Sequence, residues 1–229
     1  MKYKYILLDI DNTLFDFDAC ERQAFYRAMT ELGVPPTEAL HSRYSAINDA
    51  CWRALERGEM TREALQAARY RRLAEEFSLS FDPDEANDLY LTHLAQTDTL
   101  YPGASDFVKA LAEMAEIHII TNGLARVQTG RLQRSPLYPF IKKVFISEQV
   151  GAAKPDPAFF EAVATEIDGF DKSRAIVIGD SLTSDIKGAN NARIDCIWYN
   201  PKGKAKGGET IDHIVSDYGE ILRILRSTT

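Results

Sequence analysis

Two carboxylates, Asp9 and Asp11, lie two positions apart at the end of a short apolar run that begins at Tyr5. A run this short and aliphatic is typical of a strand buried on both faces, and a strand continued through Asp11 would turn both acids to one side. Like charges that close raise one another's pKa unless a cation neutralises them. The pair therefore predicts a hard metal ion, a lysine or both, although acids that cap a turn or face solvent would also fit the spacing.

Polar residues also follow the second apolar run, which ends at Ile120. The hydroxyl of Thr121, the amide of Asn122 and the flexible backbone of Gly123 can form a small nest of donors for a phosphate oxygen. An Asx-type turn with glycine at positive φ explains the same residues. The sequence leaves both interpretations open.

A second set of acids follows the apolar run Ile176 to Gly179. Asp180 comes directly after Gly179, a residue type that lets the backbone approach a ligand closely. Asp185 is either part of the same site or an acid that stabilises a helix N-terminus. Lys154, held out of the helical region by Pro155, could supply the positive charge that these acids need; otherwise it is a solvated surface lysine.

The elements that would position these residues alternate between strand and helix after Tyr101. Such alternation predicts right-handed crossovers and a mostly parallel α/β sheet that binds ligands beyond the carboxyl ends of its strands. The expected later strands are 117–121, 144–147, 175–179, 196–199 and 214–216, and the expected helices are 104–114, 125–134, 157–167 and 185–192.

Residues 18–98 have a different character, with apolar residues at helical spacing and Thr61 in an N-cap position. They predict an all-helical insertion after the first strand. The expected division is a core of residues 1–16 and 101–229 and a helical subdomain of residues 17–100. Hinges are expected near 16–18 and 100–103.

Composition narrows the class of protein. The chain has 229 residues, 45% hydrophobic and 27% charged, which is typical of a soluble globular protein. Its net charge of -7 argues against a nucleic-acid polymer as partner, because such a partner requires a basic face. Three scattered cysteines indicate a reducing compartment, and no run is long enough to span a bilayer, so a cytoplasmic location without membrane contact is expected. The basic, glycine-containing stretch 202–206 predicts a flexible surface loop.

The ordered set of chemical residues resembles the four motifs of the haloacid dehalogenase-like (HAD) phosphohydrolase superfamily. The motifs are Asp9-Ile10-Asp11-Asn12-Thr13, Thr121, Lys154, and Gly179-Asp180 with Asp185. The resemblance covers nearly the whole chain. It implies a Rossmann-like core with strand order 3-2-1-4-5 and a helical cap that closes over the site.

The same resemblance implies a role for each residue. Asp9 would be the nucleophile that attacks phosphorus, and Asp11 the general acid and then base. Mg²⁺ would be held by the Asp9 carboxylate, the Asp11 carbonyl and Asp180, with Asp185 completing or orienting the set. Thr121 and Asn122, followed by Gly123, would hold the phosphoryl group, whose charge Lys154 would offset.

Stretches within the cap and near the C-terminus resemble the pyrimidine 5′-nucleotidase branch, whose members remove phosphate from nucleoside monophosphates with broad specificity. They include Asn48, Trp52, Arg69 and the run 214–222. Trp52 could stack on a base while Asn48 or Arg69 bonds its edge, although all three could equally pack the cap. A small phosphorylated metabolite is therefore the expected partner, with no obligate protein partner.

The same residue pattern excludes some functions and leaves others open. In the family, dehalogenases lack the second acid, here Asp11, and phosphonatases need a cap lysine, whereas residues 18–98 contain none. A phosphatase or mutase of sugar phosphates or phosphoglycolate shares every core motif and stays open. A phospho-acceptor signalling module or a non-catalytic phosphate-binding protein is the alternative from another class.

Overall fold

The computed structural model describes residues 2–227 and divides the chain into two compact units. The first unit runs up to Phe17 and resumes at Asp98, and the second comprises Asp18–Thr97. The sequence predicted an insertion of residues 17–100. No helix within residues 2–227 is long and apolar enough to cross a membrane.

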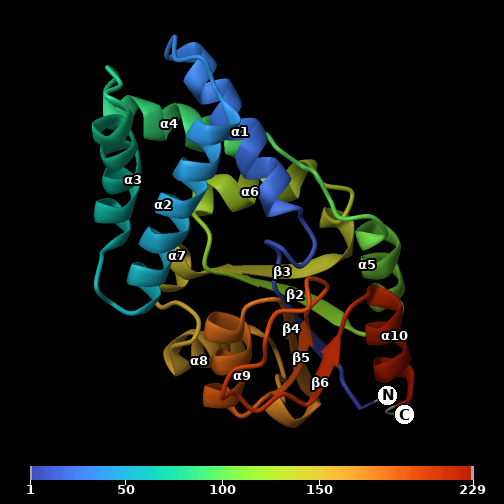
Figure 1. Cartoon of the computed structure of the whole chain (residues 1–229). Coiled ribbons are helices and arrows are strands. Elements are labelled where there is room, and N and C mark those ends of the chain that lie inside the picture. Colours follow the sequence, from blue (N-terminus) through green and yellow to red (C-terminus); the bar gives the residue numbers. More distant parts are fainter. Residues whose placement is uncertain (1, 228–229) are drawn as a thin grey trace. The chain divides into compact units, whose positions relative to one another are not determined.

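A six-stranded parallel sheet forms the centre of the first unit (Figure 1). Its order, β3-β2-β1-β4-β5-β6, confirms the predicted order 3-2-1-4-5 and adds a sixth strand at the edge. β1 lies between β2 and β4, with Leu8 in register with Ile119 and Ile178. The strands are β1 (Tyr5–Leu8), β2 (Glu116–Thr121), β3 (Ile141–Ile146), β4 (Ala175–Gly179), β5 (Asp195–Tyr199) and β6 (His213–Val215).

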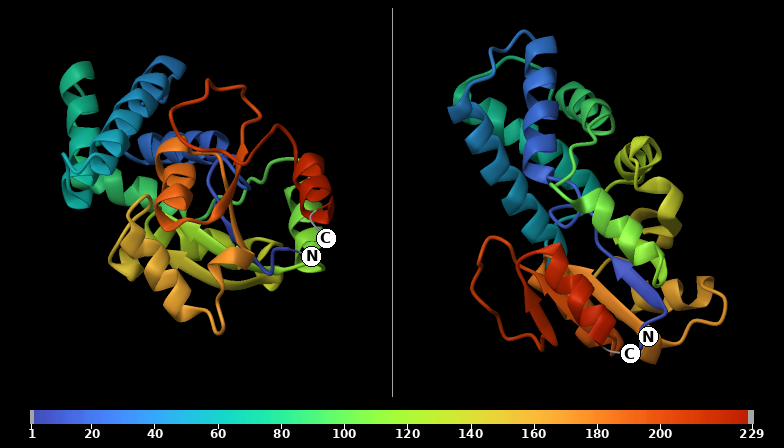
Figure 2. Two further views of the ribbon diagram at one scale, coloured as in Figure 1. Left: turned by 90° about the horizontal axis from the view of Figure 1, so that it is seen from below. Right: turned by 90° about the vertical axis from the view of Figure 1, so that its right-hand side faces the viewer.

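Helices cover both faces of this sheet. α5 (Ala104–Ala112) and α10 (Tyr218–Ser227) pack on one face, where they lie in front of the sheet in the right panel of Figure 2. α8 (Pro157–Glu166) and α9 (Lys187–Ala192) pack on the other face. The remaining elements are α6 (Ala125–Arg134), α7 (Ser147–Val150), two 3₁₀ turns (Tyr138–Phe140 and Lys172–Arg174) and a π turn (Leu182–Ile186).

Two elements start three residues earlier than the sequence predicted, at 141 rather than 144 and at 182 rather than 185. β3 was expected from residue 144, but it begins at Ile141 and includes the charged residues Lys142 and Lys143. An edge strand can turn such charges to solvent, and Lys142 is exposed. The helical segment expected from residue 185 begins with the π turn at Leu182, because the Ser181 side chain accepts a hydrogen bond from Ser184 N and caps it.

The second unit is helical, as its apolar spacing predicted. It contains most of α1 (Phe17–Glu31) and all of α2 (Glu38–Glu56), α3 (Arg62–Phe77) and α4 (Pro83–Leu94). Thr61 caps α3 by accepting a hydrogen bond from Ala64 N, which confirms its expected role. Aromatic rings fill the interior, with Tyr44 stacked on Phe25 and in contact with Tyr70 and Tyr90.

Candidate active site

Asp9 lies immediately beyond the carboxyl end of β1, in the middle of the sheet. Its backbone N–H donates to Ile178 O on β4 at 2.9 Å, which extends the pairing by one residue. The chain then turns, with Asn12 at a φ of 61° and Thr13 Oγ1 donating to Asp9 Oδ2 at 3.0 Å. Because the strand ends at Leu8, the turn rather than strand alternation decides where Asp11 points.

Lys154 pairs with two acids, Asp9 after β1 and Asp185 in the π turn after β4. Its Nζ lies 2.8 Å from Asp9 Oδ1 and 2.6 Å from Asp185 Oδ1, and it donates to Ile120 O at 2.8 Å. The ammonium group is buried, so it is not the solvated lysine of the alternative interpretation. Burial lowers the pKa of Lys154, but the carboxylates of Asp185 and Asp9 together raise it above its ordinary value.

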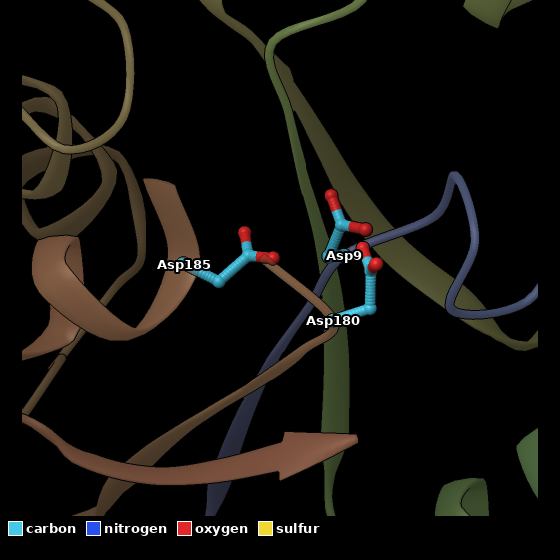
Figure 3. Close-up of side chains that lie close together, drawn as sticks. All are labelled: Asp9, Asp180 and Asp185. Carbon is cyan, nitrogen blue, oxygen red and sulfur yellow. The ribbon is translucent and has the colours of Figure 1, made fainter. Parts of the chain in front are cut away.

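Asp9, Asp180 and Asp185 form a cluster in which one oxygen from each lies within 4.8 Å of the others. Figure 3 shows the carboxylates of Asp9 and Asp180 side by side, with that of Asp185 turned toward them from the segment that leads into α9. Asp185 is fully buried and also accepts from Ser181 N at 3.0 Å, so it faces the cluster rather than serving only as a helix-terminal acid.

Among the residues that the structure describes, the cluster holds three carboxyl groups and only one buried cation, the ammonium group of Lys154. Burial raises the pKa of Asp9 to about 7, the Asp185 carboxylate adds to this, and Lys154 opposes it. Burial also raises the pKa of Asp180 and Asp185. A divalent cation bound by carboxylate oxygens would offset this charge, so the donor set fits Mg²⁺ and these three residues could hold it.

A second cation reaches the cluster from the loop that follows β5. Lys204 Nζ lies 2.9 Å from Asp180 Oδ2, although half of its side chain stays exposed. The sequence had predicted that 202–206 was a surface loop without a role. Nothing in its basic, glycine-containing composition indicates that one of its lysines pairs with Asp180, an acid 24 residues earlier.

Asp11 points to α6 and lies outside the three-carboxylate cluster. Its Oδ1 accepts from Arg131 Nη1 at 2.5 Å, and its Oδ2 accepts from Gln128 Nε2 at 2.5 Å. Sequence reasoning missed both partners. The one signal is their spacing of three residues on a helix that starts just after the second motif, which places them on one face.

The three residues at the end of β2 and just after it, Thr121, Asn122 and Gly123, all form hydrogen bonds. Thr121 Oγ1 accepts from Gly123 N at 3.0 Å and from Gln128 Nε2 at 3.1 Å. The Asn122 amide bonds both backbone groups of Lys154, at 2.8 and 2.9 Å, and so orients that lysine. Gly123 does not have a positive φ, so the alternative turn with glycine in that conformation is wrong. Direct contact of Asn122 and Gly123 with phosphate stays a prediction.

Two tyrosines support the turn that carries Asp9 and Asp11. Tyr218 of α10 donates to Thr13 O at 2.7 Å and stacks between Phe107 and Tyr199. The Tyr101 hydroxyl lies 3.3 Å from Asn12 Oδ1. Tyr101 had no predicted role, and Tyr218 belongs to the stretch that carried the nucleotidase resemblance.

Of the three predicted cap residues, Asn48 and Arg69 are buried in the interior of the helical unit. Arg69 donates to Asn48 Oδ1 at 3.0 Å and to Asn87 Oδ1 at 2.7 Å, and Asn48 donates to Glu21 Oε2 at 2.8 Å. These four residues are buried, whereas Trp52 is only partly so. The arrangement favours a packing role for Asn48 and Arg69, and substrate contact by the three cap residues stays a prediction.

Replacing Arg69 with Met should lower the free energy of unfolding by about 3 kcal/mol or more, because it removes the cation from a buried network that includes the Glu21 carboxylate. Urea denaturation would measure the change. Arg71 is exposed on the same helix, and Arg71→Met should change stability by less than about 0.5 kcal/mol. Equal effects of the two changes would show that the network does not stabilise the cap.

Comparison with known proteins points to one family. A family model described as haloacid dehalogenase-like hydrolase matches residues 3–193. The chain is 42% identical over 202 residues to the pyrimidine 5′-nucleotidase PynA of Streptococcus pneumoniae, covering 88% of this chain and 85% of that protein. It is 34% identical over 200 residues to the pyrimidine 5′-nucleotidase YjjG of Escherichia coli, covering 87% of each.

A solved structure of similar length also matches. It is the HAD-hydrolase YfnB of Bacillus subtilis bound to magnesium, with a TM-score of 0.94 and 33% identity, covering 98% of this chain and 99% of that one. Similarity therefore extends over both units of the chain and includes the segments that carry the acidic cluster.

Proposed function

Because the chain belongs to the haloacid dehalogenase-like hydrolase family and its relatives include phosphatases, we propose that it is a Mg²⁺-dependent phosphomonoesterase of broad specificity acting on nucleoside 5′-monophosphates, pyrimidine nucleotides in particular. The observation that carries the proposal is the buried Asp9 carboxylate, held by Lys154 on one oxygen and by Thr13 on the other, with Asp11 two residues away. This is the constellation that an aspartate nucleophile needs.

In the proposed reaction, an Asp9 carboxylate oxygen attacks phosphorus and the ester P–O bond breaks. Asp11 gives its proton to the departing oxygen of the nucleoside. Water then attacks the aspartyl-phosphate, Asp11 takes a proton from that water, and the bond between Asp9 and phosphorus breaks to release inorganic phosphate. Lys154 offsets charge on Asp9 throughout, because it is buried and fixed by three hydrogen bonds.

The residues proposed to hold Mg²⁺ are Asp9, Asp180 and Asp185, joined by the backbone carbonyl of Asp11 as the family resemblance implies. The metal would neutralise the acids and the phosphoryl oxygens. Support comes from the raised pKa of the three carboxylates and from the magnesium bound to the similar YfnB structure.

We also propose that the helical unit, Asp18–Thr97, acts as a cap that closes over the core and excludes water during the reaction. The YfnB structure is described as revealing interdomain movement, which supports a mobile cap in this family. Two pyrimidine 5′-nucleotidases among the relatives support a nucleotide as the substrate that such a cap would select.

A phosphate-release screen tests the substrate class. Pyrimidine and purine nucleoside 5′-monophosphates, sugar phosphates and phosphoglycolate would be compared by kcat/KM at saturating Mg²⁺. Pyrimidine nucleotides should have the highest values of kcat/KM. A higher kcat/KM for sugar phosphates or phosphoglycolate would overturn the nucleotide assignment while leaving the phosphatase chemistry intact.

Calcium should replace magnesium poorly. Ca²⁺ is larger and takes more ligands in a looser geometry, so it should bind the carboxylates without aligning the in-line displacement. Hydrolysis of p-nitrophenyl phosphate should therefore require Mg²⁺ and be inhibited by excess Ca²⁺. Equal rates with the two ions would contradict the proposed role of the metal.

A further inference from the structure

We infer that Gln128 and Arg131 of α6 position the acid/base carboxylate of Asp11, an inference that rests on the proposed function. Each residue holds a different oxygen of that carboxylate, Gln128 on Oδ2 and Arg131 on Oδ1, both at 2.5 Å. Two hydrogen bonds to two oxygens fix the direction and the rotation of the carboxylate plane, which a single bond would leave free.

Arg131 is itself held in place. Its side chain is fully buried, and its guanidinium carbon lies 4.3 Å from the centre of the Phe15 ring and 6.0 Å from that of Phe17. Arginine is seldom buried without a specific partner, and here the partner is Asp11. Asp11 remains one-quarter exposed, so the fixed carboxylate is still open to a reactant.

Gln128 connects Asp11 to the residue that the family resemblance assigns to the phosphoryl group. The same Nε2 atom that bonds Asp11 lies 3.1 Å from Thr121 Oγ1. One amide therefore sets the distance between the acid/base group and Thr121. Such positioning matters because small displacements of a catalytic group from its reactant cost large factors in rate.

Gly123 explains how Gln128 reaches this place. A Cβ atom at Gly123 would lie 2.2 Å from Gln128 Nε2 and 2.8 Å from its Cδ, far inside contact distance. The glycine is thus needed for space, since its φ is one that other residues adopt. Gly123→Ala should push the Gln128 amide away from Asp11 without removing any polar group from the site.

Positioning of Asp11 by Gln128 and Arg131 should produce a leaving-group effect. A poor leaving oxygen needs the proton from Asp11, whereas p-nitrophenolate departs without it, so only the former should be sensitive to a misplaced acid. The test compares kcat/KM for p-nitrophenyl phosphate with that for p-methylphenyl phosphate, which has a similar shape and a more basic leaving group. The ratio of the two kcat/KM values does not depend on the fraction of enzyme that folds.

Arg131→Met, Gln128→Met and Gly123→Ala should each raise this ratio by about 10-fold or more. Arg131→Lys, which keeps a cation near Asp11, should recover part of the loss. Gln133 and Arg134 are exposed on the same helix, and Gln133→Met and Arg134→Met should leave the ratio unchanged.

Asp11→Asn separates the inference from the proposed function on which it rests. If Asp11→Asn leaves the ratio unchanged, Asp11 is not the acid and the proposed mechanism fails. If Asp11→Asn raises it but the three positioning variants do not, the inference alone is overturned. Adding Arg131→Met to Asp11→Asn should cause no further rise, because Arg131 acts through Asp11; a further rise would also overturn it.

Discussion

Replacing Asp9 with Asn should lower kcat for phosphate-ester hydrolysis by about 10⁴-fold or more. The amide cannot form the aspartyl-phosphate, and loss of a catalytic nucleophile costs factors of this size in other covalent enzymes. The fold should survive, since the amide has nearly the shape of the carboxylate and Lys154 keeps its contacts with Asp185 and Ile120 O. Steady-state phosphate release and thermal unfolding would measure the two effects.

The control for Asp9→Asn is an exposed acid outside the site. Asp171 is exposed at the 3₁₀ turn before β4, and Asp171→Asn should leave kcat within about twofold, since it lies away from the reacting groups. A kcat for Asp9→Asn within tenfold of the unchanged enzyme would refute covalent catalysis by Asp9.

Replacing Lys154 with Met should lower both activity and stability. Its ammonium is the buried cation between Asp9 and Asp185, and removing it leaves two carboxylates facing one another in a buried site. We expect kcat/KM to fall by about 10²- to 10³-fold, the usual cost of removing one preorganised charge-stabilising donor. The free energy of unfolding should fall by about 3 kcal/mol, because a buried charge pair loses one partner.

Lys187 provides the matched control, since it is exposed at the start of α9 close in sequence to Asp185. Lys187→Met should change neither quantity appreciably. If Lys154→Met kept its stability but lost activity, Lys154 would act only in catalysis. If it kept its activity, the assigned neutralising role would be wrong.

The order of strand-end residues was enough to predict the central cluster. Asp9, Asp180 and Lys154 each follow an element that the hydrophobic pattern located, and parallel strands bring their carboxyl ends to one edge. Alternation predicted a mostly parallel sheet, and the family resemblance implied its strand order. The cluster itself depended on local patterns and one topological rule.

Contacts that arise across the chain were not predictable in this way. Arg131 pairs with Asp11 over 120 residues, and its spacing from Gln128 is that of any helix face. Glu21 and Asn87 come from helices other than those of Asn48 and Arg69, so only packing of the bundle shows that Arg69 points inward. The partner of a buried polar side chain is set by tertiary structure, which composition and periodicity do not encode.

Trapping a covalent intermediate on Asp9 would distinguish nucleophilic catalysis by this residue from direct attack of water on the phosphate ester. The Asp11→Asn variant should accept the phosphoryl group from ³²P-labelled p-nitrophenyl phosphate, because that leaving group needs no acid, and should release it slowly for want of a base. After acid quench and proteolysis, the label should be found on the peptide that contains Asp9. Absence of stable label under single-turnover conditions, or label on another residue, would contradict the mechanism.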